Sequence, residues 1–134
     1  MTTIDNRLTE INIDELISQV GVPFNNISDT SIEECIKHKI FLAPHCIYNN
    51  NAFSYDTHTY HAFSYDTHTY HLLRIATIVN EIQTDKYNYN YPISIWDDSE
   101  DDAHHEWAID CGEHHIRAFY YCKKNIYMSI NRSG

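Results

Sequence analysis

The heptapeptide GEHHIRA, residues 112–118, brings a glycine, an acid and three hydrogen-bond donors to the point where an expected strand meets an expected helix. Helix starts have unpaired N–H groups and a partial positive charge, and together these bind phosphate. Glycine allows close approach of the backbone to a ligand. The alternative is an ordinary strand–turn–helix with a capping acid and exposed histidines. A phosphate-ligand site here would be made of Gly112, Glu113, His114, His115 and Arg117, and the residues alone leave both interpretations open.

Residues 52–71 read AFSYDTHTYH twice without a change. One interpretation is a zinc or nickel site, for which the candidates are His58, His61, His68 and His71. Against it, the tract has no helical apolar stripe, and ten residues at about 100° each leave a mismatch of about 80°. A functional array is a further alternative. We favour a tolerated duplication in a loop or at the edge of an element, because closing a longer loop costs little more free energy.

Either copy of the decapeptide could fill the native position while the other loops out. This ambiguity favours exchange of the segment between chains, and so a homo-oligomer that forms through the duplicated segment.

The charge balance is strongly acidic, with 9 Lys and Arg against 19 Asp and Glu and a net charge of −10. A DNA-binding protein needs a clustered basic face, so direct DNA binding is not expected. The acidic run comprises Asp97, Asp98, Glu100, Asp101 and Asp102. It could hold Mg²⁺ or Ca²⁺, form a solvated hairpin loop, or dock on a basic protein partner. The alternative function is therefore an acidic interaction module without catalysis, such as an immunity protein or an inhibitor of a nucleic-acid-binding enzyme.

The length of 134 residues indicates one domain, 1–134. The four cysteines form no CxxC pair, and no signal peptide or long apolar run is visible. We therefore expect a cytoplasmic protein with reduced thiols and no membrane partner.

Apolar spacing and capping residues predict a small mixed sheet with packed helices, an α/β or α+β fold. Residues 8–21 read as a strand followed by a helix with Asp14 as its N-cap and Gly21 at its end. The next helix is expected to begin at Asp29, Thr30 or Ser31 and to stop at Pro44. The remaining expected elements are a helix from about Tyr70, strands 91–96 and 106–112, a helix 112–124 and a strand 125–130.

GEHHIRA and its flanking elements resemble the ParB/sulfiredoxin-like superfamily, in particular the ParB N-terminal-like domain. The resemblance covers roughly residues 8–17 and 70–130, including the helix that leads to a Pro-started strand and the final strand NIYMSI. It implies a nucleoside triphosphate with Mg²⁺ as ligand, CTP in ParB-type and ATP in kinase-like members. It also implies that Glu113 orients the loop or a metal, which makes Glu113 the candidate for a catalytic role in hydrolysis or phosphotransfer.

The chain departs from this pattern at two positions. His115 stands where the family usually has Arg, which replaces a permanently charged contact with a titratable one. Glu113 stands where sulfiredoxins place their nucleophilic Cys, and Cys111 precedes the glycine instead. We therefore expect no sulfinic-acid reduction. Because no helix-turn-helix domain follows, chromosome segregation by this chain alone is not expected either.

Overall fold

The computed structural model describes residues 4–42, 66–98 and 106–132. Within these ranges the chain forms a mixed α+β fold, as the sequence predicts. The elements in chain order are β1 (Thr9–Ile11), α1 (Ile13–Val20), α2 (Asp29–Lys37), α4 (Thr67–Gln83), β2 (Ser94–Asp97), β3 (Trp107–Cys111), α5 (Glu113–Cys122) and β4 (Ile126–Arg132).

Four strands form one mixed sheet in the order β1-β4-β2-β3. The outer pairs, β1 with β4 and β2 with β3, are antiparallel, whereas the central pair, β2 with β4, is parallel. The parallel register places Ile95 opposite Ile130. Parallel neighbours need a crossover, and the chain makes it through β3 and α5.

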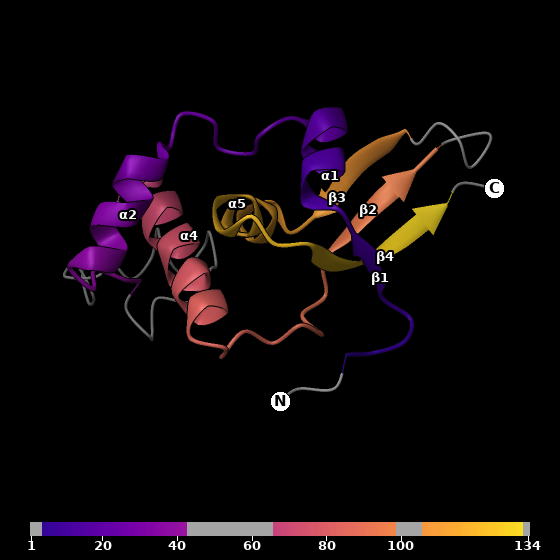
Figure 1. The fold of residues 1–134 in the computed structure, drawn as a ribbon. Helices are drawn as coiled ribbons and strands as arrows, with labels where there is room; N and C mark the ends of the chain where they lie inside the picture. Colours follow the sequence, from indigo (N-terminus) through magenta and orange to yellow (C-terminus); the bar gives the residue numbers. More distant parts are fainter. Residues whose placement is uncertain (1–3, 43–65, 99–105, 133–134) are drawn as a thin grey trace, which may run out of the picture.

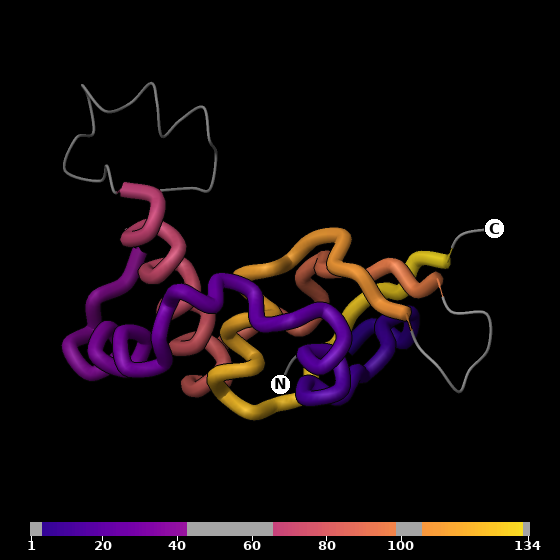
Figure 2. The backbone as a smooth tube through the Cα atoms, turned by 90° about the horizontal axis from the view of Figure 1, so that it is seen from above, coloured from indigo at the N-terminus to yellow at the C-terminus, as the bar shows by residue number. Residues whose placement is uncertain are grey.

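Helix α5 occupies the middle of the molecule, with the sheet on one side and α4 and α2 on the other (Figure 1 and Figure 2). Its central turn is buried on all sides through Ile116, Ala118 and Phe119, none of which is measurably exposed. These side chains belong to one core with Ile75 and Val79 of α4, Ile95 of β2, and Ile126 and Met128 of β4. Helix α4 packs against α5, and α2 packs against α4.

Helix starts differ from the sequence prediction by one to three residues. Asn12, not Asp14, caps α1 by accepting a hydrogen bond from the Glu15 N–H at 2.9 Å. Ser28, not one of the three residues after it, caps α2 through the Ser31 N–H. Both caps have extended backbone and a short side chain with an oxygen acceptor, which is what the position requires. Gly21 ends α1 as predicted, but α2 ends at Lys37, well before Pro44.

The second copy of the decapeptide runs into α4. Asp66 caps this helix by accepting from the Thr69 N–H at 2.8 Å, so α4 begins at Thr67 rather than near Tyr70. Tyr70 is 3% exposed. The end of the second copy is therefore part of a packed helix, while the first copy lies outside the described residues.

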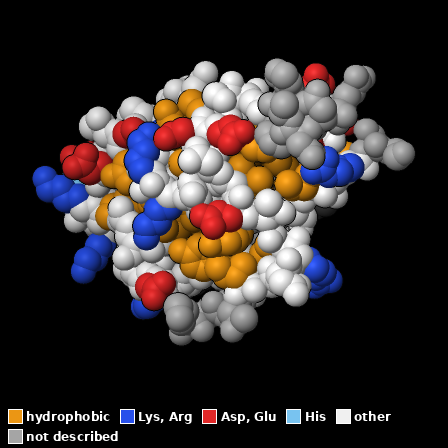
Figure 3. Space-filling model, turned by 45° about the vertical axis from the view of Figure 1, so that its right-hand side comes forward, with side chains coloured by type: hydrophobic (Ala, Val, Ile, Leu, Met, Phe, Trp, Pro, Cys, Tyr) orange, Lys and Arg blue, Asp and Glu red, His pale blue; other side chains and the backbone are white. Residues whose placement is uncertain are grey.

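Charged side chains of both signs are interspersed around apolar ones on the face drawn in Figure 3. No helix of the described ranges is both long enough and apolar enough to cross a membrane.

Gly112 joins β3 to α5 in a backbone conformation that residues with a side chain rarely adopt. Its φ is +101°, and a Cβ atom built on it would lie 2.3 Å from Cγ2 and 2.7 Å from Cβ of Ile93. Ile93 is 1% exposed and belongs to the core, so it has no room to move away. The glycine therefore lets the start of α5 lie directly against the residue that leads into β2.

We expect Gly112→Ala to lower the free energy of unfolding by about 3 kcal/mol, because it adds a steric overlap to backbone strain. Gly21→Ala is the matched control, since Gly21 also has a positive φ (+80°) but no atom within 4 Å of the position that a Cβ would take. Gly21→Ala should lower the free energy of unfolding only by the backbone strain, about 1–2 kcal/mol. Urea unfolding followed by circular dichroism measures both, and equal losses would contradict the steric account.

Candidate functional site

A cavity of about 580 Å³ opens at the start of α5. Four of the five predicted ligand residues line it, namely Gly112, Glu113, His114 and His115. The other lining residues are Phe24, His71, Arg74, Tyr91, Pro92, Asp110 and Cys111. The walls therefore come from the α1–α2 connection, from α4, from the segment before β2, and from the β3–α5 turn.

The first turn of α5 presents its backbone donors at this cavity. The first intrahelical hydrogen bond runs from the Ile116 N–H to the Gly112 carbonyl at 2.9 Å. The N–H groups of Glu113, His114 and His115 precede it, and Gly112 supplies no side-chain cap. Unpaired N–H groups at a helix start attract anions.

His115 is a buried polar side chain between the cavity and the core, with 5% of its surface exposed. Its Nδ1 lies 2.9 Å from the Tyr87 hydroxyl, whereas its buried Nε2 has no hydrogen-bond partner among the described residues. The Tyr91 ring stacks on the imidazole with 4.2 Å between centroids. Burial lowers the pKa of His115 to about 4, so the ring is neutral at pH 7.

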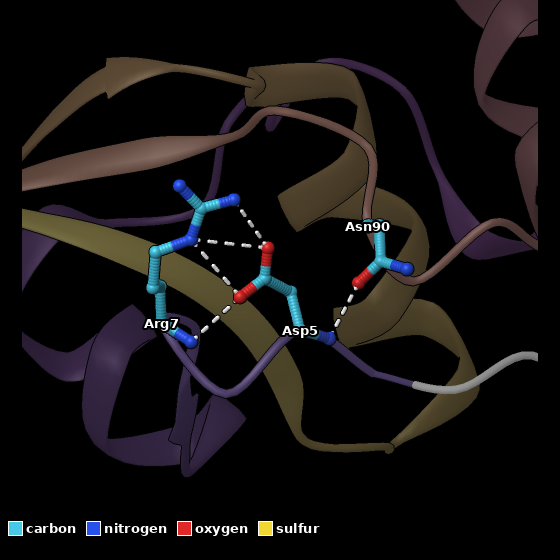
Figure 4. Close-up of polar contacts among 3 residues, drawn as sticks. All are labelled: Asp5, Arg7 and Asn90. Carbon is cyan, nitrogen blue, oxygen red and sulfur yellow. Dashed lines mark hydrogen bonds and ion pairs between the residues drawn. The ribbon is translucent and has the colours of Figure 1, made fainter.

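The segment that carries Tyr91 is tied to the residues before β1. The Asp5 N–H donates to the Asn90 side-chain oxygen at 2.7 Å, and the Asp5 carboxylate accepts from the Arg7 guanidinium (Figure 4). This ion pair holds the pKa of Asp5 down at about 2. Asn90, the residue before Tyr91, is thus held in place by a residue near the N-terminus.

Two further imidazoles face each other across the cavity wall. His71 Nδ1 and His114 Nε2 are 2.8 Å apart, so one ring donates a hydrogen bond and the other accepts it. Phe24 packs on both rings with centroid distances of 4.6 Å. Burial lowers the pKa of His114 to about 3 and also lowers that of His71. The pair is therefore neutral at pH 7.

Arg74 is one of the cavity residues that the sequence did not predict. It is the only Lys or Arg of α4, and it lies half-buried among apolar residues at the cavity. A single cationic residue within the apolar pattern of a helix is the sequence feature that could have marked Arg74 as a site residue. Opposite charge comes from Glu113 and Asp110, which are both exposed. Asp110 accepts hydrogen bonds from Ser94 at 2.7 Å and from Asn131 at 3.3 Å.

Arg117 does not line the cavity, which corrects its assignment as a ligand contact there. Two residues along a helix correspond to about 200°, so Arg117 faces away from His115. Its Nη2 donates to the Ile27 carbonyl at 2.9 Å and to the Asp29 carboxylate at 2.7 Å, and the residue is 3% exposed. Arg117 thus fastens α5 to the segment that starts α2.

The metal hypothesis for the duplicated tract has no support within the described part of the chain. No cluster of three or more His, Cys, Asp or Glu residues able to hold a metal ion occurs there. His68 is exposed on the first turn of α4, and His71 instead contacts His114. His58 and His61 lie outside the described residues.

Of the acidic run, only Asp97 and Asp98 are described. Asp97 is 3% exposed, and its carboxylate lies 3.7 Å from Arg132 Nη1. It is therefore not accessible to a protein partner, whereas Asp98 is exposed.

No protein-family model, no curated protein and no solved structure matches this chain. The chemistry of the site therefore rests on its own geometry.

The neutral imidazoles predict a specific dependence of stability on pH. An unfolded histidine takes up a proton near pH 6.5, whereas folded His115 does so only near pH 4. Between these values the unfolded state binds more protons, so the free energy of unfolding falls as the pH falls. Each such imidazole contributes at most ~1.4 kcal/mol per pH unit.

His115→Gln should make this dependence less steep between pH 6.5 and 4, because it removes a group that takes up a proton more readily in the unfolded state. Urea unfolding at several pH values and constant ionic strength measures the slope. An identical slope for His115→Gln and the unmodified chain would show that His115 is not buried and neutral.

Proposed function

We propose that this protein binds a small phosphate-bearing ligand, a nucleotide, in the cavity at the start of α5. The observation that carries the proposal is the buried His115 imidazole, whose Nε2 lacks a described partner next to the uncapped first turn of a helix. Buried polar groups are nearly always hydrogen-bonded, and an exception calls for an explanation. A ligand group at the helix start would supply the missing partner.

The volume and composition of the cavity support this proposal. About 580 Å³ lies within the range of small-molecule sites. Arg74 offers a guanidinium for phosphate. Phe24 and Tyr91 add flat apolar surface, as ligand sites usually have.

Glu113 and Asp110 oppose the charge of a phosphate. With neutral imidazoles, the charged side chains at the cavity are Arg74 against these two carboxylates. A bound Mg²⁺ would resolve the conflict, because this ion prefers one or two carboxylates together with phosphate oxygens. The carboxylates that would hold it are Glu113 and Asp110. We therefore propose that the ligand binds more tightly with Mg²⁺.

The resemblance to the ParB/sulfiredoxin-like superfamily supports the same site from the sequence, and we propose that relationship as well. The resemblance supports phosphates near Gly112, His114 and His115. Because Arg74 and not Arg117 lines the cavity, we propose Arg74 for the role that the resemblance gave to Arg117. For turnover, the resemblance offers Glu113 alone as a carboxylate, and no hydrogen bond positions Glu113 in the described part of the chain. We therefore propose binding rather than hydrolysis.

The test is a thermal-shift panel of pyrophosphate and the common nucleoside triphosphates, each with and without Mg²⁺. A ligand at 100 times its dissociation constant stabilises by about 2.7 kcal/mol, a shift of several degrees for a domain of this size. We expect Arg74→Gln and His115→Gln to lose most of that shift. Lys37→Gln, an exposed cation on α2, is the matched control and should retain it.

The melting temperature of each variant without ligand shows whether it is folded. If no phosphate compound stabilises the unmodified chain at millimolar concentration, the proposed function is wrong.

A further inference from the structure

A second cavity of about 210 Å³ adjoins the first. The two cavities share Arg74, Tyr91 and His115 in their walls, so the stacked rings of Tyr91 and His115 lie between them. Ligand pockets for whole small molecules start at about 300 Å³. The second cavity therefore has room for one ring system of a ligand rather than for an entire nucleotide.

Most polar groups in its wall already have partners. The Thr77 hydroxyl donates to the Leu73 carbonyl at 2.7 Å and accepts from the Leu42 N–H at 3.0 Å. The Tyr87 hydroxyl pairs with His115. These groups have little remaining capacity for a ligand.

The other polar groups of the wall are the Arg74 guanidinium, the Tyr91 hydroxyl, the Glu81 carboxylate and the amide group of Asn88, and the last two bear on the choice of ligand. The Asn88 side-chain oxygen accepts from the Asn90 N–H at 3.0 Å, which leaves its nitrogen as a donor. Neither Glu81 nor the Asn88 nitrogen has a hydrogen-bond partner in the described ranges. An ionised carboxylate is an acceptor only. Glu81 and Asn88 together thus offer two acceptor oxygens and one donor.

Glu81 is half-buried, and burial raises the pKa of its carboxyl group, with Arg74 as the only opposing influence. Its charge is therefore partly desolvated without compensating hydrogen bonds. A ligand with two neighbouring N–H donors would give each carboxylate oxygen a hydrogen bond and so compensate for the lost hydration.

We propose that the second cavity holds the base of the bound nucleotide and that this base is guanine. Its N1–H and N2–H groups would donate to Glu81, and its O6 would accept from Asn88. Among the common bases only guanine presents two adjacent N–H donors beside an acceptor; adenine and cytosine present one amino group beside an acceptor nitrogen. This inference rests on the proposed function, because the phosphate at the start of α5 brings the base to this cavity.

The surrounding side chains fit a planar heterocycle. Leu42 and Ile78 give the cavity apolar walls, and the exposed face of Tyr91 offers an aromatic surface for stacking. The ribose would then pass beside the Tyr91–His115 stack, between the two cavities.

Isothermal titration calorimetry with GTP, ITP, ATP and CTP in Mg²⁺ buffer at pH 7.5 tests the inference. ITP lacks only the 2-amino group of guanine, so it removes one of the two bonds to Glu81. We expect GTP to bind roughly tenfold to a hundredfold more tightly than ITP, since hydrogen bonds to charged groups are strong. Glu81→Gln should abolish this difference, and Glu34→Gln, an exposed residue on α2, should preserve it.

The outcomes separate this inference from the proposed function. If all four nucleotides bind equally and Glu81→Gln changes nothing, the guanine assignment is wrong while nucleotide binding stands. If none binds, both proposals fail. Should Glu81→Gln not fold, the comparison of GTP with ITP on the unmodified chain decides the matter.

Discussion

The contact between Gly112 and Ile93 determines where α5 starts. Ile93 is buried just before β2, and β2 occupies a central place in the sheet. Because position 112 has no side chain, the last residue of the β3–α5 turn can lie against Ile93. The helix then enters the core between the sheet and α4. The uncapped first turn of α5 is thereby held at the rim of the cavity by the packing of the core itself.

A second consequence of this packing is that the polar groups of the site are also structural. His115 fills core space while it hydrogen-bonds to Tyr87, and His114 pairs with His71 of α4. Burial excludes the charged form of the imidazoles, so Arg74 and the helix start provide the positive potential of the cavity. An anion bound there would meet one guanidinium and several neutral donors, so the geometry of the donors would contribute to selection alongside charge.

Local pattern was enough to predict the order of the elements and the α+β class. The strands around Ile95 and Ile109, and the helix that follows Gly112, have apolar spacing and boundaries within a short stretch of chain. Four of the five residues of GEHHIRA predicted as ligand contacts line one cavity for the same reason, since they share one helix start. The orientation of Arg117 was mistaken because a motif gives residue types but not the face each occupies on a helix. Arg74, Phe24 and Tyr91 come from three distant segments, and their convergence depends on tertiary packing that local pattern does not encode.

The place of the repeat at the start of α4 has a genetic consequence. Asp66, Tyr70 and His71 all belong to the second copy, and LLRIATIV follows that copy directly. Removal of ten codons by slippage between the two repeats gives the same protein whichever copy is lost. The shortened chain would still place the capping aspartate, the buried tyrosine and the cavity histidine immediately before the apolar part of the helix. The locus can therefore contract by one repeat unit without altering a single residue that α4 contributes to the site.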